Sequence, residues 1–222
     1  MNGEVIVVDD VPAEFSERVV EAFHNRPGDG FSLVLSGGGT ARRCYERLAA
    51  DGADQLDWWQ VDVYWGDERC VPPDDPDSNE RLGREALLER VGAANAVYPM
   101  RCDDGPDPYQ QRVAQAGRLD IVHLGLGPDG HTASLFPGSA ALDADPGRLV
   151  VMNTDPTGRN VHRRMTLTFS GIARARLAMV TVEGAAKRDA FAAVCAGDPE
   201  VPATRIQADR VVWLVDPAAA GR

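Results

Sequence analysis

Residues 119–138 read LDIVHLGLGPDGHTASLFPG, an apolar run followed by a glycine-rich turn that contains His131. The run at 119–126 predicts a buried strand, and 132–136 predicts a short helix that ends before a Pro-Gly pair. His131 is therefore expected where a strand ends and a helix begins. Open α/β sheets bind ligands beyond the carboxyl ends of their strands, and histidine exchanges protons near neutral pH. This position favours a functional role for His131, whereas hydrogen-bonded structural roles are expected for the other histidines, His24, His123 and His162.

Strands and helices alternate along the chain. Apolar or alternating runs predict further strands at residues 4–8, 31–35, 61–65, 149–152, 165–169, 177–182 and 211–215. Helical spacing of apolar side chains predicts helices around Phe15, Val19 and Phe23, after the glycines at 37–39, and at 79–91 and 185–195. Such alternation is typical of an α/β fold with a mostly parallel, Rossmann-like sheet and helices on both faces. A single domain over residues 1–222 is expected, with solvated loops at 72–77 and 103–108.

The composition excludes several function classes. A formal net charge of −11 argues against a nucleic-acid binder, which normally carries a basic surface. Because no apolar stretch approaches the length of a membrane span and the chain opens without a leader pattern, we expect a cytoplasmic protein with no membrane partner. A monomer or small homo-oligomer is expected. The cysteines are widely spaced, which predicts neither a metal site nor a disulfide framework and fits a reducing cytoplasm; they are Cys44, Cys70, Cys102 and Cys195.

The turn around His131 also contains the spacing G-x-G-x-x-G, at Gly125, Gly127 and Gly130. This spacing is typical of dinucleotide binding only where the third glycine opens a long crossover helix. Here Pro137 stops the following helix early, and Asp129 places a carboxylate where pyrophosphate would lie. A nucleotide cofactor is therefore not expected.

A second glycine-rich turn follows the strand at 31–35. It consists of Ser36, Gly37, Gly38, Gly39 and Thr40. A helix begins there, so its unpaired N–H groups and its dipole favour an anion, and the glycines let a phosphate approach the backbone. The turn is not a Walker loop, because no Gly-Lys-Ser/Thr follows. A phosphate site is preferred over the alternative, a tight turn that only needs positive φ angles.

Polar side chains follow two further strands. After the strand at 61–65, Arg69 could hold a phosphate or carboxylate and Asp67 could orient a base, although a surface ion pair is an equal alternative. Lys187, the only lysine in the chain, lies in the first turn of a helix after the strand at 177–182. A single lysine in a chain that otherwise uses arginine suggests a position that needs a compact charge on a flexible stem, although chance retention is an equal alternative.

The motifs SGGGT, WGDER, DSN, GLGPDGHTASLFPG, RMTLT and EGAAKRD occur in this order between about residues 35 and 190. In this order and spacing the chain resembles the bacterial 6-phosphogluconolactonases. The resemblance implies a fold shared with glucosamine-6-phosphate deaminases and ribose-5-phosphate isomerases. It also implies hydrolysis, without a cofactor, of 6-phosphoglucono-1,5-lactone, a phosphorylated sugar lactone of the pentose phosphate pathway.

The resemblance also implies roles for individual residues. His131 would be the general base and Asp129 would orient it, while Asp67 matches a carboxylate that shuttles protons in the deaminases. The 6-phosphate would be held by the loop at 38–40, Arg69 and Lys187. Arg164 matches the arginine of the family's R-V-T motif and would line the site, with the adjacent Arg163 as the alternative.

Two other functions remain open at this point. A glucosamine-6-phosphate-type isomerase or deaminase carries an acidic residue five positions after the histidine, whereas this chain has Phe136 there. Phe136 therefore favours the lactonase. A non-catalytic sugar-phosphate sensor would bind the same ligand without turning it over.

Overall fold

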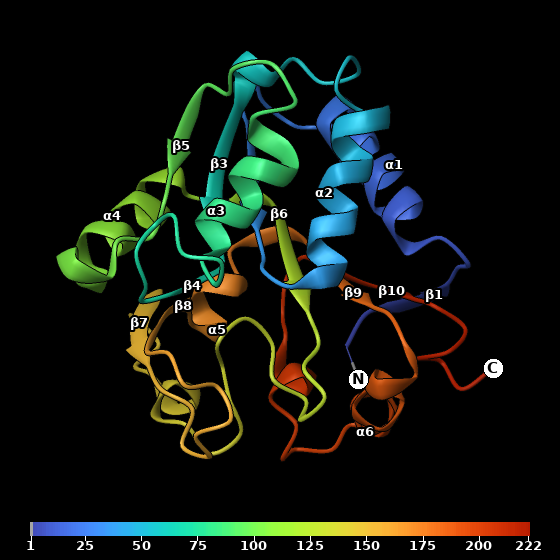
Figure 1. The fold of residues 1–222 in the computed structure, drawn as a ribbon, viewed down its shortest axis with the longest axis vertical. Coiled ribbons are helices and arrows are strands. Elements are labelled where there is room, and N and C mark those ends of the chain that lie inside the picture. Colours follow the sequence, from blue (N-terminus) through green and yellow to red (C-terminus); the bar gives the residue numbers. More distant parts are fainter. Residues whose placement is uncertain (1) are drawn as a thin grey trace.

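The computed structural model describes residues 2–222 and contains a large sheet whose neighbouring strands all run parallel (Figure 1). The strand order is β1-β10-β9-β6-β2-β3-β5. In chain order the strands are β1 (Glu4–Val7), β2 (Phe31–Leu35), β3 (Val61–Trp65), β5 (Ala96–Tyr98), β6 (Leu119–Gly125), β9 (Ala175–Val182) and β10 (Arg210–Val215). The predicted parallel, Rossmann-like sheet is confirmed.

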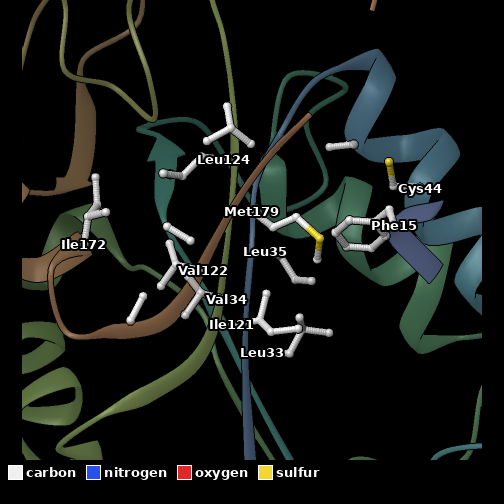
Figure 2. Packing of buried hydrophobic residues seen from close by; sticks show 14 of the residues in the cluster. Phe15, Leu33, Val34, Leu35, Cys44, Ile121, Val122, Leu124, Ile172 and Met179 are labelled. Atoms are coloured by element: carbon white, nitrogen blue, oxygen red, sulfur yellow. The ribbon is translucent and has the colours of Figure 1, made fainter. Parts of the chain in front are cut away.

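Helices pack on both faces of this sheet. Helices α1 and α2 pack on each other and contact β9, which α5 also contacts. Figure 2 shows Phe15 of α1 and Cys44 of α2 on one side of the strands and Ile172 of α5 on the other. The helices are α1 (Val11–His24), α2 (Gly39–Asp51), α3 (Asn79–Gly83), α4 (Pro106–Ala116), α5 (Phe169–Ile172) and α6 (Arg188–Ala196). Within residues 2–222, no helix is both long enough and apolar enough to cross a membrane.

Local chemistry explains where these elements begin and what they bury. The Asp10 carboxylate caps α1 by accepting a hydrogen bond from the Ala13 N–H at 3.0 Å. Phe15, Val19 and Phe23 recur at helical spacing and form the buried stripe of this helix. All five residues of β2 are buried, as expected for a strand covered on both faces.

A smaller antiparallel sheet lies beside the large one, in the order β4-β8-β7. Its strands are β4 (Asp67–Arg69), β7 (Val150–Asn153) and β8 (Arg164–Leu167). The apolar runs at 149–152 and 165–169 predict strands of the parallel sheet. Instead they form β7 and β8, which pair with each other, and β8 also pairs with β4. In this register Arg69 lies directly opposite Arg164, and Asp67 lies opposite Thr166.

Other local predictions were wrong or incomplete. The helix predicted at 132–136 does not form, because Ala133 has a φ of 47° and the Ser134 N–H donates to the Thr166 side chain at 3.1 Å. The stretch at 103–108, interpreted as a loop, includes the start of α4, which has a proline in its first turn. The three-residue strands β4 and β5 are too short to show a hydrophobic period. Residues 79–91 divide into α3 and a π-helical turn, Arg84–Leu88.

The cysteine prediction was also wrong, because Cys70 and Cys102 form a disulfide. Cys70 directly follows β4, and Cys102 begins the 3-10 turn Cys102–Asp104. The two residues are 32 positions apart. Their pairing depends on the packing of two distant segments, so no short spacing motif could have indicated it.

Reduction of this disulfide is expected to lower the free energy of unfolding by about 3 to 4 kcal/mol, the loop-closure entropy of a 32-residue loop. Urea denaturation of the oxidised and reduced protein measures the difference. The variant Cys70→Ser/Cys102→Ser should unfold like the reduced wild type. Equal unfolding midpoints for the oxidised and reduced protein would contradict the expectation.

Candidate active site

A cavity of about 180 Å³ opens at the carboxyl ends of β2 and β6 and is bordered by β4 and β8. Most of the predicted site residues line it: Ser36, Gly37, Gly38, Asp67, Arg69, His131, Arg164 and Lys187. Gly39 and Thr40 begin α2 beside the cavity without lining it, and Asp129 contacts His131. The structure thus brings together residues that come from five separate parts of the chain.

His131 is held by Asp129 within its own turn. Its Nδ1–H donates to Asp129 Oδ1 at 2.5 Å, and its backbone N–H donates to the same oxygen at 3.2 Å. The His131 carbonyl accepts the Gly127 N–H at 2.7 Å, which closes the turn. Because Asp129 occupies Nδ1, the neutral ring keeps its lone pair on Nε2, and 23% of the side chain remains exposed.

Glycine is required at position 127 for this arrangement. A Cβ there would collide with the His131 ring and with the Asp129 carboxylate. Burial raises the pKa of Asp129, but its hydrogen bonds to His131 and the charge of that ring outweigh burial, and the pKa lies below the usual carboxyl value. Asp129 therefore stays ionised and orients the ring.

The SGGGT turn presents the N-terminus of α2 to the cavity. Gly38 is the N-cap residue, with a φ of 96° that favours glycine, and no side chain caps the helix. The first N–H groups of α2 are therefore available to an anion. The Ser36 N–H, in contrast, donates to the Tyr45 hydroxyl at 2.6 Å, which fixes the start of the turn.

A buried polar chain continues behind this turn. The Tyr45 hydroxyl bonds to His123 Nδ1 at 2.8 Å, and His123 Nε2 bonds to Thr181 Oγ1 at 2.9 Å. The predicted structural role of His123 is confirmed. Its side chain is 0% exposed, and burial lowers its pKa to about 3. It therefore remains neutral in the folded protein at ordinary pH.

The buried His123 is expected to make the protein acid-sensitive. Below about pH 6.5 the unfolded chain protonates this histidine while the folded chain does not, so the stability present at higher pH is lost as the pH falls toward 3. Between pH 7 and pH 5 the wild type should lose about 2 kcal/mol more unfolding free energy than His123→Leu. Urea denaturation at both pH values checks this; equal losses in the two proteins would refute it.

Two arginines face each other across β4 and β8. Opposite residues of an antiparallel pair project to the same face, so Arg69 and Arg164 place two positive charges together. Arg164 is 5% exposed, and burial together with the charge of Arg69 lowers its pKa despite the opposing effect of Asp67. The Nε atoms of both arginines are buried without a hydrogen-bond partner among residues 2–222. Arg163, the alternative to Arg164, is exposed and does not line the cavity.

Asp67 is held by neighbours that the sequence reasoning did not assign to the site. Its Oδ2 accepts the Ser134 hydroxyl at 2.5 Å, and Asn79 Nδ2 donates to its Oδ1 at 3.3 Å and to its carbonyl at 2.9 Å. Ser134, Asn79 and Asn160 also line the cavity. Asn79 belongs to the DSN motif and Ser134 to the GLGPDGHTASLFPG motif. Only the fold shows that these two side chains converge on Asp67.

Lys187 also lines the cavity and comes from the segment that follows β9. It ends the 3-10 turn Ala185–Lys187 that leads into α6. Burial lowers the pKa of Lys187, and the charge of Asp129 partly opposes this effect. Within the described residues, no group of three or more His, Cys, Asp or Glu side chains is arranged to hold a metal ion.

Known proteins are similar to this chain in sequence and in fold. The family model for glucosamine-6-phosphate isomerases/6-phosphogluconolactonase matches residues 5–213. The 6-phosphogluconolactonase of Nostoc sp. (strain PCC 7120) is 38% identical over 207 residues, which cover 85% of this chain and 83% of that protein. The 6-phosphogluconolactonase of Mycobacterium tuberculosis is 38% identical over 210 residues, which cover 86% of this chain and 84% of that protein. The crystal structure of 6-phosphogluconolactonase from Thermotoga maritima superposes with a TM-score of 0.84 at 27% identity, covering 96% of this chain and 98% of that chain. This chain belongs to the glucosamine-6-phosphate isomerase/6-phosphogluconolactonase family.

Proposed function

We propose that this protein hydrolyses 6-phosphoglucono-1,5-lactone to 6-phosphogluconate. The observation that carries the proposal is the oriented His131–Asp129 pair, which shares one small cavity with the cationic side chains of Arg69, Arg164 and Lys187. The His131–Asp129 pair suits proton transfer, and the three cationic side chains suit a phosphorylated substrate. The lactonase relatives support the same substrate class.

Arg69, Lys187 and the start of α2 would bind the phosphate. Two like charges placed opposite each other on a sheet destabilise it, and a phosphate bound to Arg69 offsets the repulsion between Arg69 and Arg164. The free N–H groups that follow Gly38 add donors of the right polarity. Lys187 lines the same cavity and contributes a third charge.

His131 would act as the general base. Its Nε2 removes a proton from water as the water oxygen attacks C1 of the lactone. The same proton is then returned to the ring oxygen as the tetrahedral intermediate collapses and the ring opens. Asp129 stabilises the protonated imidazole through Nδ1. Such help is typically worth about 10²- to 10⁴-fold in rate.

The negative charge that develops on the carbonyl oxygen needs hydrogen-bond donors. In the glycine turn, the N–H groups of Gly127 and Gly130 are already used by the carbonyls of His131 and Gly127. Arg164 lines the cavity and has a buried Nε with no hydrogen-bond partner in the described part of the chain. We therefore assign the stabilisation of this oxyanion to Arg164.

The proposal also covers domain organisation, oligomeric state and cellular compartment. Residues 1–222 would act as one domain, as a monomer or small homo-oligomer, in the cytoplasm. A phosphorylated lactone is charged and does not cross membranes freely, which supports an enzyme in the compartment where the substrate is formed.

The proposal is tested by measuring acid release from 6-phosphoglucono-1,5-lactone, with spontaneous opening subtracted. A rate well above the uncatalysed one is expected at catalytic protein concentration. Hydrolysis at the background rate, or ammonia release from glucosamine 6-phosphate, would contradict the assignment and favour a sensor or a deaminase.

A further inference from the structure

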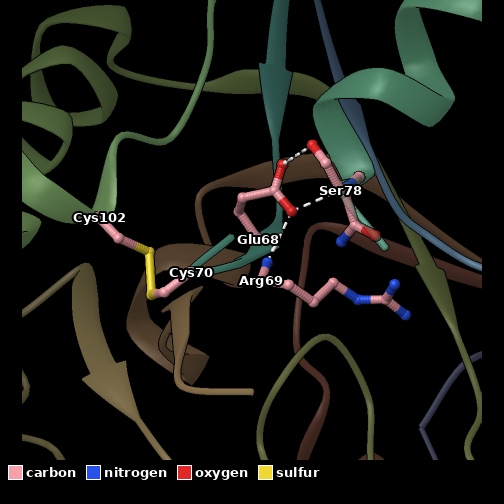
Figure 3. The surroundings of a disulfide bond; sticks show 6 residues. Glu68, Arg69, Cys70, Ser78 and Cys102 are labelled. Atoms are coloured by element: carbon pink, nitrogen blue, oxygen red, sulfur yellow. Dashed lines mark hydrogen bonds between the residues drawn. A yellow bond between two sulfur atoms is a disulfide. The ribbon is translucent and has the colours of Figure 1, made fainter. Parts of the chain in front are cut away.

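The disulfide Cys70–Cys102 lies next to the proposed phosphate site. Figure 3 shows that Cys70 directly follows Arg69, whose side chain extends away from the disulfide. Both cysteines are half-buried and border a second cavity of about 480 Å³, which also touches Arg69. The disulfide is therefore reachable from solvent on one side, and its neighbour in sequence contributes to the active-site cavity on the other.

We propose that this disulfide is a redox-modification site at which a dithiol reductant weakens binding of the substrate phosphate through Arg69. The inference rests on the function proposed above. Disulfides in a reducing compartment are rare, and those that occur are usually transient or redox-sensing. A partly exposed disulfide beside a binding residue fits that pattern better than a permanent structural link does.

The exchange proceeds in two steps. A thiolate of the dithiol attacks one cysteine sulfur, the S–S bond breaks, and the other cysteine leaves as a thiolate that takes up a proton. The second thiol of the reductant then attacks the mixed disulfide. This releases the remaining cysteine, which is also protonated, and leaves the reductant as a disulfide. Two electrons and two protons pass to the protein, and the reductant is oxidised.

Arg69 responds because the disulfide tethers the strand that carries it. On one side, the Cys70 N–H donates to the carbonyl of Arg163, the residue before β8, at 2.8 Å. On the other side, Arg101 precedes Cys102 and pairs with Glu80 of α3, with Nη2 to Oε1 at 2.8 Å. The disulfide thus links β4 covalently to a segment that is itself anchored on α3.

Glu68 connects the same parts without a covalent bond. As Figure 3 shows in part, its buried carboxylate accepts hydrogen bonds from the backbone N–H groups of Arg69, Asn79 and Glu80 and from the Ser78 hydroxyl. Arg69 Nη1 in turn donates to the Asp77 carbonyl at 2.6 Å. Reduction removes the covalent restraint, so that Arg69 is positioned only by noncovalent contacts such as these bonds and the pairing of β4 with β8. The fold should therefore persist while phosphate binding weakens.

The other cysteines do not compete for this chemistry. Cys44 is fully buried, and burial raises its pKa far above the usual thiol value, so its reactive thiolate is suppressed. Cys195 is exposed on α6, outside both cavities. The variant Cys195→Ser removes this exposed thiol and is the background in which the disulfide is tested.

The test compares oxidised and dithiothreitol-reduced protein in this background, with alkylation and mass measurement to count thiols. Reduction is expected to raise KM for 6-phosphoglucono-1,5-lactone about 5-fold or more, the lower end of typical coupling between sites. The value of kcat/KM for unphosphorylated glucono-1,5-lactone should stay unchanged. Adding Cys70→Ser/Cys102→Ser should reproduce the reduced behaviour with or without dithiothreitol, and circular dichroism should show that both forms stay folded.

The outcomes separate the two proposals. If oxidised protein hydrolyses the phosphorylated lactone and reduced protein does so with the same KM, the redox proposal is wrong and the proposed function stands. A disulfide that does not form under oxidising conditions, or equal losses on both lactones, also overturns the redox proposal. If the oxidised protein hydrolyses neither lactone, the proposed function itself fails.

Discussion

His131→Ala is expected to lower kcat for 6-phosphoglucono-1,5-lactone by about 10²- to 10⁴-fold, the usual worth of general acid-base catalysis. The substitution removes the only group in the proposed scheme that takes the proton from water. It leaves the cationic side chains in place, so KM should change little. Initial rates over a range of lactone concentrations, corrected for spontaneous hydrolysis, give both constants.

The matched control is His24→Ala, which removes an exposed histidine from the last turn of α1, away from the cavity. This variant should retain wild-type kcat. Asp129→Asn should give a smaller loss than His131→Ala, because it keeps the base and weakens only its orientation. Wild-type kcat in His131→Ala would remove the proposed base from the mechanism.

Lys187→Ala is expected to lower kcat/KM for the phosphorylated lactone by about 10- to 100-fold. Hydrogen bonds to charged groups contribute about 1.5 to 3 kcal/mol, and this charge is half-buried, where water screens it less. The loss should appear mainly in KM. For unphosphorylated glucono-1,5-lactone, kcat/KM should remain at the wild-type value, since that substrate has no phosphate to bind.

Arg188→Ala is the control for Lys187→Ala. Arg188 is the next residue in the chain and is exposed, and its Nε donates to the Ala218 carbonyl at 3.3 Å instead of lining the cavity. Arg188→Ala removes the same formal charge and should leave kcat/KM for both lactones at the wild-type value. If Lys187→Ala impaired both lactones equally, Lys187 would act on the reacting centre or on the fold, and its assignment to the phosphate would be wrong.

The sequence was sufficient to predict the parallel sheet and the elements that meet at its carboxyl edge. Buried strands such as β2 and β6 are mostly apolar, and the glycine turns that follow them are local signals. These signals place the SGGGT turn and the turn of His131 at the same edge of the sheet. Lys187 belongs to that edge as well, because it follows β9.

Contacts between distant segments could not be predicted in this way. The small sheet β4-β8-β7 depends on pairing a three-residue strand with residues almost 100 positions later, so the opposition of Arg69 and Arg164 had no local signal. The same applies to Ser134 and Asn79 around Asp67, and to the disulfide. Their positions depend on tertiary packing, which no spacing rule in one sequence describes.

The central claim is that one cavity binds the phosphate and activates water for attack on the lactone. It is tested most directly by the ratio of kcat/KM for 6-phosphoglucono-1,5-lactone to that for glucono-1,5-lactone, measured on the oxidised wild-type protein. The cationic cluster predicts a ratio of about 100 or more, since two charged contacts at about 1.5 kcal/mol each would suffice. A ratio near one, or no acceleration of either hydrolysis, would contradict the account.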